Sequence, residues 1–329
     1  MATFLIQRAL SSVKAPKTLS RHLTTSAAAV TAAAATQTPP EAAPSSPFTF
    51  NDDANDNICI RSPRPQTTAS SSYSSSVTMP MSFMTGSIVG KRFYKQVTTR
   101  ESDDGIGWSV MLDYRTLKTP SKRPLKLPTL GLAKAIAAEW EYQQTDGIRP
   151  FTMPLMKLAC TALERVPLTR PKVIEHLMKK FNQDLVFCRA PDDNDLTSDV
   201  HERQVEKIDP LLEWLNSEFG FKPVVYSSFF GGKQEDGLVK AVEDLLKKTN
   251  DCELAAIDAM AAAAHSLVIA IALFRGRLQI EEAIELIRLE EDVQVDKWGL
   301  VEGGHDIDIA DLKVQISSAV VFLGLSRRT

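Results

Sequence analysis

The pattern of apolar positions divides the chain into an aperiodic region, a short stretch typical of strands and a long stretch typical of helices. Residues 27–86 are low in complexity, with an alanine run and a serine run. Such a segment buries too little apolar surface to offset the entropy that it loses on ordering. We therefore predict a disordered linker over residues 27–88 and a folded body that begins near Val89.

Alternating apolar and polar positions predict strands at the start of the folded body. Residues 91–97 and 108–112 are two strand candidates, and a turn at 113–115 leads to a third candidate at 116–119. Residues 124–128 are expected at a sheet edge, because their flanking prolines cannot donate to a strand ladder.

Helical spacing of apolar positions follows and continues to the C-terminus. Thr129 is expected to cap a helix through Trp140. Later helices are expected over 154–166, after a cap at Thr169, through 205–219 (with a restart or a kink at Pro210), over 236–248 and 280–300, and from Asp306 or Asp308 onward. The sequence thus predicts an α+β fold, in which residues 89–152 form a small mixed α/β domain and residues 153–329 a larger all-helical domain.

The run at residues 259–274 is almost wholly apolar, interrupted only by His265 and Ser266. A run of this length is short for a bilayer span, and it is rich in alanine rather than leucine. We expect one buried central helix there and no membrane span.

The N-terminus has the composition of an organelle-targeting sequence. Residues 1–40 contain four basic residues and no acidic one, and residues 21–26 resemble a two-step mitochondrial processing site. We predict a mitochondrial transit peptide over residues 1–26 and delivery to the mitochondrial matrix. A chloroplast transit peptide, with the stroma as destination, is the alternative because the stretch is rich in serine and alanine.

Charge and cysteine content narrow the classes of function. Six of the 38 basic and four of the 41 acidic side chains lie in residues 1–90, which leaves 32 and 37 in the remainder. A mildly acidic body does not favour nucleic acid as a partner. The four cysteines are far apart and form no CxxC pair, so neither a disulfide framework nor a zinc site is expected.

The sequence lacks the common motifs of nucleotide-binding, serine-hydrolase and zinc-protease sites. We expect no cofactor, no resident metal and no enzymatic activity. The alternative is a matrix enzyme with an acid–base or metal site at Glu302, His305 and Asp306, beside a flexible glycine pair. The competing interpretation of that stretch is an inter-helix loop whose aspartate caps the last helix.

The helix predicted at residues 280–300 carries a carboxylate in an apolar stripe. At about 100° per residue, Ile284, Ile287 and Trp298 share one face, Glu291 falls in its middle and Glu290 at its margin. An unpaired buried carboxylate is costly. Either Glu291 pairs with a cation or donor within the fold, or the stripe faces a partner and Glu291 selects it.

Several segments, in this order and spacing, resemble the ATP synthase F(1) assembly factor 2 family, the chaperones of the alpha subunit. They are residues 92–95, 117–120 with 124–125, 137–140 with 144, 153–155, 184–185, 209–212 and the stretch from Glu290 to Asp306. The resemblance spans residues 91–325. Tyr114 departs from the family's usual Asp-Gly-Arg turn, since tyrosine lacks the freedom of glycine at positive φ.

The resemblance implies a small α+β domain, a helical domain and no ATP hydrolysis. It implies that the chain binds the unassembled alpha subunit and prevents its aggregation until beta replaces the chaperone. A stable structural subunit of a matrix complex is a further alternative. We expect the chain to be monomeric when free, and the residues expected to contact the partner are Glu290, Glu291, Gln294, Trp298 and Glu302.

Overall fold

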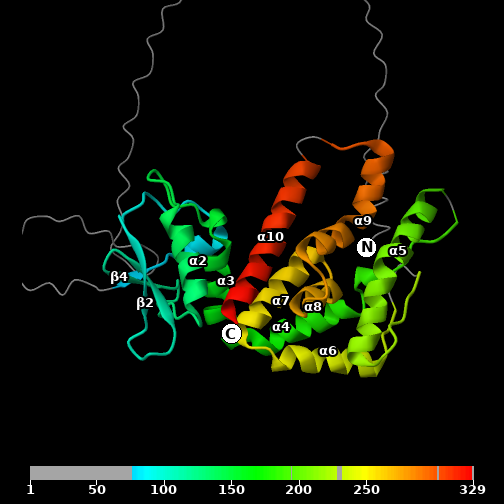
Figure 1. Ribbon diagram of the computed structural model, residues 1–329, viewed down its shortest axis with the longest axis horizontal. Coiled ribbons are helices and arrows are strands. Elements are labelled where there is room, and N and C mark those ends of the chain that lie inside the picture. The colour runs from blue at the N-terminus through cyan, green and yellow to red at the C-terminus, as the bar shows by residue number, and fades with distance from the viewer. Residues whose placement is uncertain (1–75, 194, 228–231, 302–303, 328–329) are drawn as a thin grey trace, which may run out of the picture. The chain divides into compact units, whose positions relative to one another are not determined.

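The computed structural model describes residues 76–193, 195–227, 232–301 and 304–327 (Figure 1). The predicted transit peptide and most of the predicted linker lie outside these residues. The strands are β1 (Ser76–Thr78), β2 (Val97–Glu101), β3 (Trp108–Leu112) and β4 (Arg115–Lys118). The α-helices are α2 (Leu130–Glu141), α3 (Pro154–Cys160), α4 (Val166–Phe181), α5 (Asp195–Phe219), α6 (Asp236–Lys248), α7 (Asp251–Ala264), α8 (Leu267–Phe274), α9 (Ile280–Trp298) and α10 (His305–Ser326).

The strands form one sheet in the order β1-β4-β3-β2, with α2 packed on β2 and β3 (Figure 1). β3 is antiparallel to both neighbours, whereas β1 runs parallel to β4. The buried side chains of Val110, Leu112 and Leu117 join those of Ile136 and Trp140 of α2 in the core. The predicted α+β class, with a small sheet domain before a larger helical region, is confirmed.

Part of the predicted linker belongs to the fold, so the expected boundary near Val89 is wrong. β1 pairs with β4, and a 3₁₀ turn follows at Met81–Thr85. Phe83 in that turn is fully buried and stacks on Trp140, with ring centroids 6.2 Å apart. This segment could not be predicted from its own low-complexity sequence, because it is ordered by pairing with residues about forty positions later in the chain.

The strand predicted at residues 91–97 is also misplaced, since β2 begins only at Val97. The backbone N–H groups of Lys95 and Gln96 both donate to Asp113 Oδ1 at 2.9 Å, which holds this segment against the β3–β4 turn. The residue with positive φ in that turn is Asp113, at 55°. Tyr114 therefore needs no glycine-like conformation, and its departure from the family pattern is accommodated.

The predicted helices at α2 and α6 are confirmed, and Thr129 caps α2 by accepting a hydrogen bond from Leu132 N. The predicted cap at Thr169 is wrong. A π-helical turn at Thr161–Arg165 joins α3 directly to α4, and Thr169 Oγ1 donates to Arg165 O within the helix. At Pro210, the helix α5 continues on both sides rather than restarting.

The single helix predicted at residues 259–274 is two helices. His265, at φ 52°, ends α7 in the left-handed region, and the Ser266 side chain caps α8. Asp184 supports the break, because its Oδ2 accepts hydrogen bonds from Leu267 N at 2.7 Å and Val268 N at 3.0 Å. All eight residues of α8 are buried, so this apolar run lies in the protein core.

One hydrophobic core joins the sheet and the helices, and α10 packs against α7, α3 and α2 (Figure 1). Within the described part of the chain, α10 is the helix long and apolar enough to cross a membrane, by length and composition alone. It nevertheless contributes Ile316, Ala319, Phe322 and Leu323 to the core.

Candidate functional site

The predicted site lies on α9 and the start of α10. A capping box between Gln279 and Glu282 starts α9, which packs against α5, α8 and α10. Gly299 ends the helix at φ 84°, a conformation that favours glycine, so the chain leaves α9 directly after Trp298. This sharp end exposes the residues that follow.

A cluster of three charges organises the outer half of α9. Arg288 is only 6% exposed, and its guanidinium donates to Glu291 Oε2 at 2.9 Å and to Asp292 Oδ1 at 2.7 Å. The Glu291 side chain is 37% exposed. Glu291 thus pairs with a cation of its own helix, which is the first of the two alternatives that the sequence left open, and its carboxylate also reaches solvent.

His305 lies beside this cluster. Its Nε2 is 3.9 Å from Glu291 Oε1, and its Nδ1 accepts a hydrogen bond from Val301 N at 3.4 Å. The imidazole therefore connects the residues after α9 to Glu291 rather than standing in a separate acidic site. Asp306 is exposed, and Glu302 lies outside the described residues.

Glu290 is the more enclosed of the two adjacent glutamates, which reverses the expectation from helical periodicity. Its Oε1 accepts a hydrogen bond from Gln204 Nε2 of α5 at 3.0 Å. Burial raises the pKa of Glu290, and the hydrogen bond from Gln204 opposes that rise. Periodicity gave the angle between Glu290 and Glu291 but could not reveal that α5 covers the side of α9 on which Glu290 lies.

The remaining predicted residues differ in exposure. Trp298 is 63% exposed, and Leu300 and Val301 beside it are also exposed. Gln294 is half-buried. The apolar stripe deduced from the sequence is therefore buried at Ile284 and open at Trp298.

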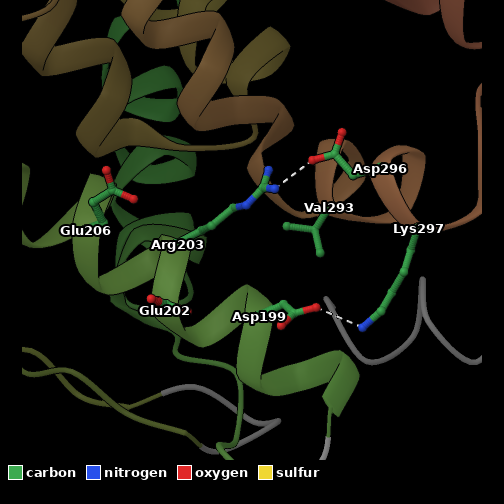
Figure 2. Close-up of a pocket in the computed structure, with 7 residues that line it drawn as sticks. All are labelled: Asp199, Glu202, Arg203, Glu206, Val293, Asp296 and Lys297. Atoms are coloured by element: carbon green, nitrogen blue, oxygen red, sulfur yellow. Dashed lines mark hydrogen bonds and ion pairs between the residues drawn. The ribbon is translucent and has the colours of Figure 1, made fainter.

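A charged pocket between α5 and α9 was not found from the sequence (Figure 2). It has a volume of about 390 Å³ and is lined by Asp199, Glu202, Arg203, Glu206, Val293, Asp296 and Lys297. Figure 2 shows Arg203 directed toward Asp296 and Lys297 directed toward Asp199. The nitrogen and oxygen atoms of these two pairs lie 2.6 Å and 2.8 Å apart, respectively. These ion pairs connect helices about ninety residues apart, and no local sequence signal could reveal them.

The described part of the site combines carboxylates with exposed apolar side chains. Among the described residues, no group of three or more His, Cys, Asp or Glu side chains is arranged to hold a metal ion. Along the outer half of α9, the partly exposed carboxylates of Glu291 and Asp292 precede the exposed side chains of Trp298, Leu300 and Val301. Such a surface can bind an apolar partner area and discriminate by charge.

The fold defines the class of protein, since it is that of the Atp12 structures. The match to Atp12 from Paracoccus denitrificans has a TM-score of 0.65 and 29% identity and covers 72% of this chain and 99% of that one. The Atu1473 protein of Agrobacterium tumefaciens matches with a TM-score of 0.66 and 30% identity over 72% of this chain and 86% of its own. The model of the ATP12 chaperone protein family matches residues 91–216. The chain belongs to the ATP12 chaperone family.

Two curated relatives also match this chain in sequence. The mitochondrial protein atp12 of Schizosaccharomyces pombe is 26% identical over 243 residues, which is 70% of this chain and 81% of that protein. The mitochondrial protein ATP12 of Saccharomyces cerevisiae is 20% identical over 270 residues and 83% of its length. The family-model match ends within α5, before α9, so it does not assign roles to the site residues.

Proposed function

We propose that this protein is a mitochondrial matrix chaperone that binds the unassembled alpha subunit of the ATP synthase F(1) sector and prevents its aggregation until beta replaces it. The family membership and the mitochondrial relatives support this proposal, as do the acid-free N-terminus and the sequence resemblance. Glu290, Glu291, Gln294, Trp298 and Glu302 remain the residues proposed to contact the partner.

The observation that carries the proposal is the surface at the junction of α9 and α10. Trp298, Leu300, Val301 and Ile307 are all large apolar side chains and all exposed. Exposed apolar side chains that gather in one short stretch mark an interaction site, and tryptophan is enriched among residues that dominate binding energy. We call these four residues, with Glu291 beside them, the α9–α10 surface.

The composition of this surface suits a temporary partner. A subunit awaiting assembly exposes an apolar interface that would otherwise aggregate, and Trp298 and its neighbours can cover such an area. Glu291 is held in place by Arg288 and still reaches solvent, so it can select a partner by charge without the cost of full burial. Moderate affinity then permits release when the correct subunit arrives.

The proposal is tested by binding of the full chain to purified alpha and, separately, to beta. Trp298→Ala is expected to weaken alpha binding about tenfold, which corresponds to about 1.4 kcal/mol. Tyr142→Ala is the matched control, because Tyr142 is also a highly exposed aromatic residue but lies after α2. Equal alpha binding by wild type and Trp298→Ala would contradict the assignment of this surface.

Charge selection is tested by reversing one carboxylate. Glu291→Lys is expected to weaken alpha binding, because it places a cation beside Arg288 and removes the acidic group from the surface. Glu175→Lys, an exposed change on α4, is the control. If Glu291→Lys folds and binds alpha like the wild type, Glu291 has no role in partner selection.

A further inference from the structure

His305, the first residue of α10, binds both backbone groups of Val301. The Val301 N–H donates to His305 Nδ1 at 3.4 Å, and the Val301 carbonyl oxygen accepts a hydrogen bond from His305 N at 3.2 Å. Gly304 N donates to the same carbonyl oxygen at 3.3 Å. Among the described residues, no acceptor other than the imidazole is hydrogen-bonded to the Val301 N–H. His305 therefore fixes the backbone at Val301.

The same hydrogen bond defines the state of the imidazole. Because Nδ1 accepts the Val301 N–H, the proton of the neutral ring lies on Nε2. Nε2 is 3.9 Å from Glu291 Oε1, and Glu291 is in turn held by Arg288. Only 28% of the His305 side chain is exposed. The ring is thus engaged within the chain on both sides, between the backbone of Val301 and the charge cluster of α9.

The side chains beside this contact are apolar and exposed. Val301 is 61% exposed, and Leu300 and Trp298 before it are 51% and 63% exposed. A side chain on a mobile backbone loses conformational freedom when it binds, and that loss weakens binding. A backbone that is already held before binding avoids much of this cost. His305 therefore fixes the backbone of Val301 while it leaves the Val301 side chain open to a partner.

We propose that His305 is a positioning residue for partner binding, which holds Val301 in the orientation that the partner requires by accepting its N–H at Nδ1. His305 acts through the α9–α10 surface and does not belong to it. The identity of the partner as the alpha subunit rests on the function proposed above, whereas the fixed backbone at Val301 rests on the geometry of His305.

Two amide variants separate the roles of the two imidazole nitrogens. In His305→Asn, the amide oxygen stands as far along the side chain as Nδ1 and can accept the Val301 N–H. In His305→Gln, the amide group stands one bond further out, as Nε2 does, and reaches toward Glu291 instead. His305→Ala lacks both contacts. His176→Ala, at an exposed histidine of α4, is the matched control.

Binding of the full chain to purified alpha subunit on a sensor surface tests the role in recognition. His305→Ala and His305→Gln are expected to bind about fivefold more weakly than the wild type, whereas His305→Asn and His176→Ala bind like the wild type. The loss is expected in the association rate constant, because only molecules with Val301 in place are competent to bind. Circular dichroism shows that each variant is folded.

Amide hydrogen exchange tests the contact with Val301 in the absence of any partner. In the full chain with isotope-labelled valine, the Val301 N–H is identified by its absence from the spectrum of Val301→Ala. This amide is expected to exchange slowly in the wild type and His305→Asn, and to lose its protection in His305→Ala and His305→Gln. Equal exchange in all four proteins overturns the proposal.

The outcomes separate this proposal from the proposed function. If the wild type binds alpha and His305→Ala binds equally well, His305 has no positioning role while the proposed function stands. Rescue by Gln rather than by Asn contradicts the role of Nδ1. A loss confined to the dissociation rate constant would make His305 a contact residue instead. If the wild type does not bind alpha, the proposed function fails and the role of His305 in binding fails with it.

Discussion

Arg288 and Glu291 lie one turn apart on α9, and the buried guanidinium of Arg288 donates to the half-exposed carboxylate of Glu291 at 2.9 Å. The cation faces the protein and the anion faces outward, so Arg288 fixes the position of Glu291 at the surface. The same guanidinium also donates to Asp292 through its other terminal nitrogen. Loss of Arg288 therefore removes the partner of two carboxylates, whereas loss of either carboxylate leaves Arg288 paired with the other.

This asymmetry predicts unequal effects on stability. Arg288→Ala is expected to lower the free energy of unfolding by about 2 kcal/mol, because it removes a buried group with two charge-assisted hydrogen bonds. Glu291→Gln is expected to cost less than about 1 kcal/mol, because Glu291 is partly solvated and Asp292 still pairs with Arg288. Urea unfolding of the two variants measures the difference. A larger loss for Glu291→Gln would show that this assignment of roles is wrong.

Asp184 is expected to contribute strongly to the free energy of unfolding. Its carboxylate is buried and accepts hydrogen bonds from Val186 N, Leu267 N and Val268 N. Asp184→Ala leaves these donors without their acceptor and is expected to lower the free energy of unfolding by about 3 kcal/mol or more. Asp146→Ala, an exposed change, serves as the control and is expected to stay within about 0.5 kcal/mol.

Glu139 is expected to make stability depend on pH. It accepts hydrogen bonds from Leu155 N at 2.7 Å and Met156 N at 2.8 Å, and thereby connects α2 to the start of α3. Burial raises the pKa of Glu139 from 4.5 to about 7, although both hydrogen bonds oppose the rise. The folded state therefore holds this proton more tightly than the unfolded state. Its contribution to stability is fully present below pH 4.5 and is lost as the pH rises through about 7.

Thermal melts of the wild type and Glu139→Gln between pH 4.5 and pH 8 measure this contribution. The melting temperature of the wild type is expected to fall, relative to that of Glu139→Gln, as the pH increases over this range. Glu175→Gln removes an exposed carboxylate on α4 and provides the comparison. Parallel pH profiles for wild type and Glu139→Gln would contradict the raised pKa.

His265 holds a conformation that costs free energy. It is exposed and has a φ of 52°, in the left-handed region that glycine adopts without a steric penalty. His265→Gly is therefore expected to raise the free energy of unfolding by about 1 kcal/mol. Calorimetry measures the shift, and a destabilised variant would indicate that the imidazole contributes more than the backbone strain costs.

The sequence predicted best those elements whose signals are local. The alternation at Trp108–Leu112, the cap at Thr129 and the amphipathic pattern at Asp236–Lys248 each predicted an element that the structure contains. The break at His265 was missed because an unbroken apolar run has no periodicity from which a helix end can be read. β1 was missed because its order depends on pairing with β4.

The candidate site was predicted in part. The sequence placed Glu291 and Trp298 on one helix, but it could not show that Arg288 turns inward to pair with Glu291 or that Gln204 reaches Glu290 from α5. These features depend on contacts between distant segments.

Chaperone activity toward the alpha subunit is measured by following light scattering while denatured alpha subunit is diluted into buffer with the full chain. We expect that an equimolar amount of this protein suppresses alpha aggregation, that the two proteins co-elute, and that added beta subunit displaces this protein from alpha. Albumin at the same concentration is the control for crowding. If alpha aggregates equally with this protein and with albumin, the proposed chaperone function for the alpha subunit is wrong.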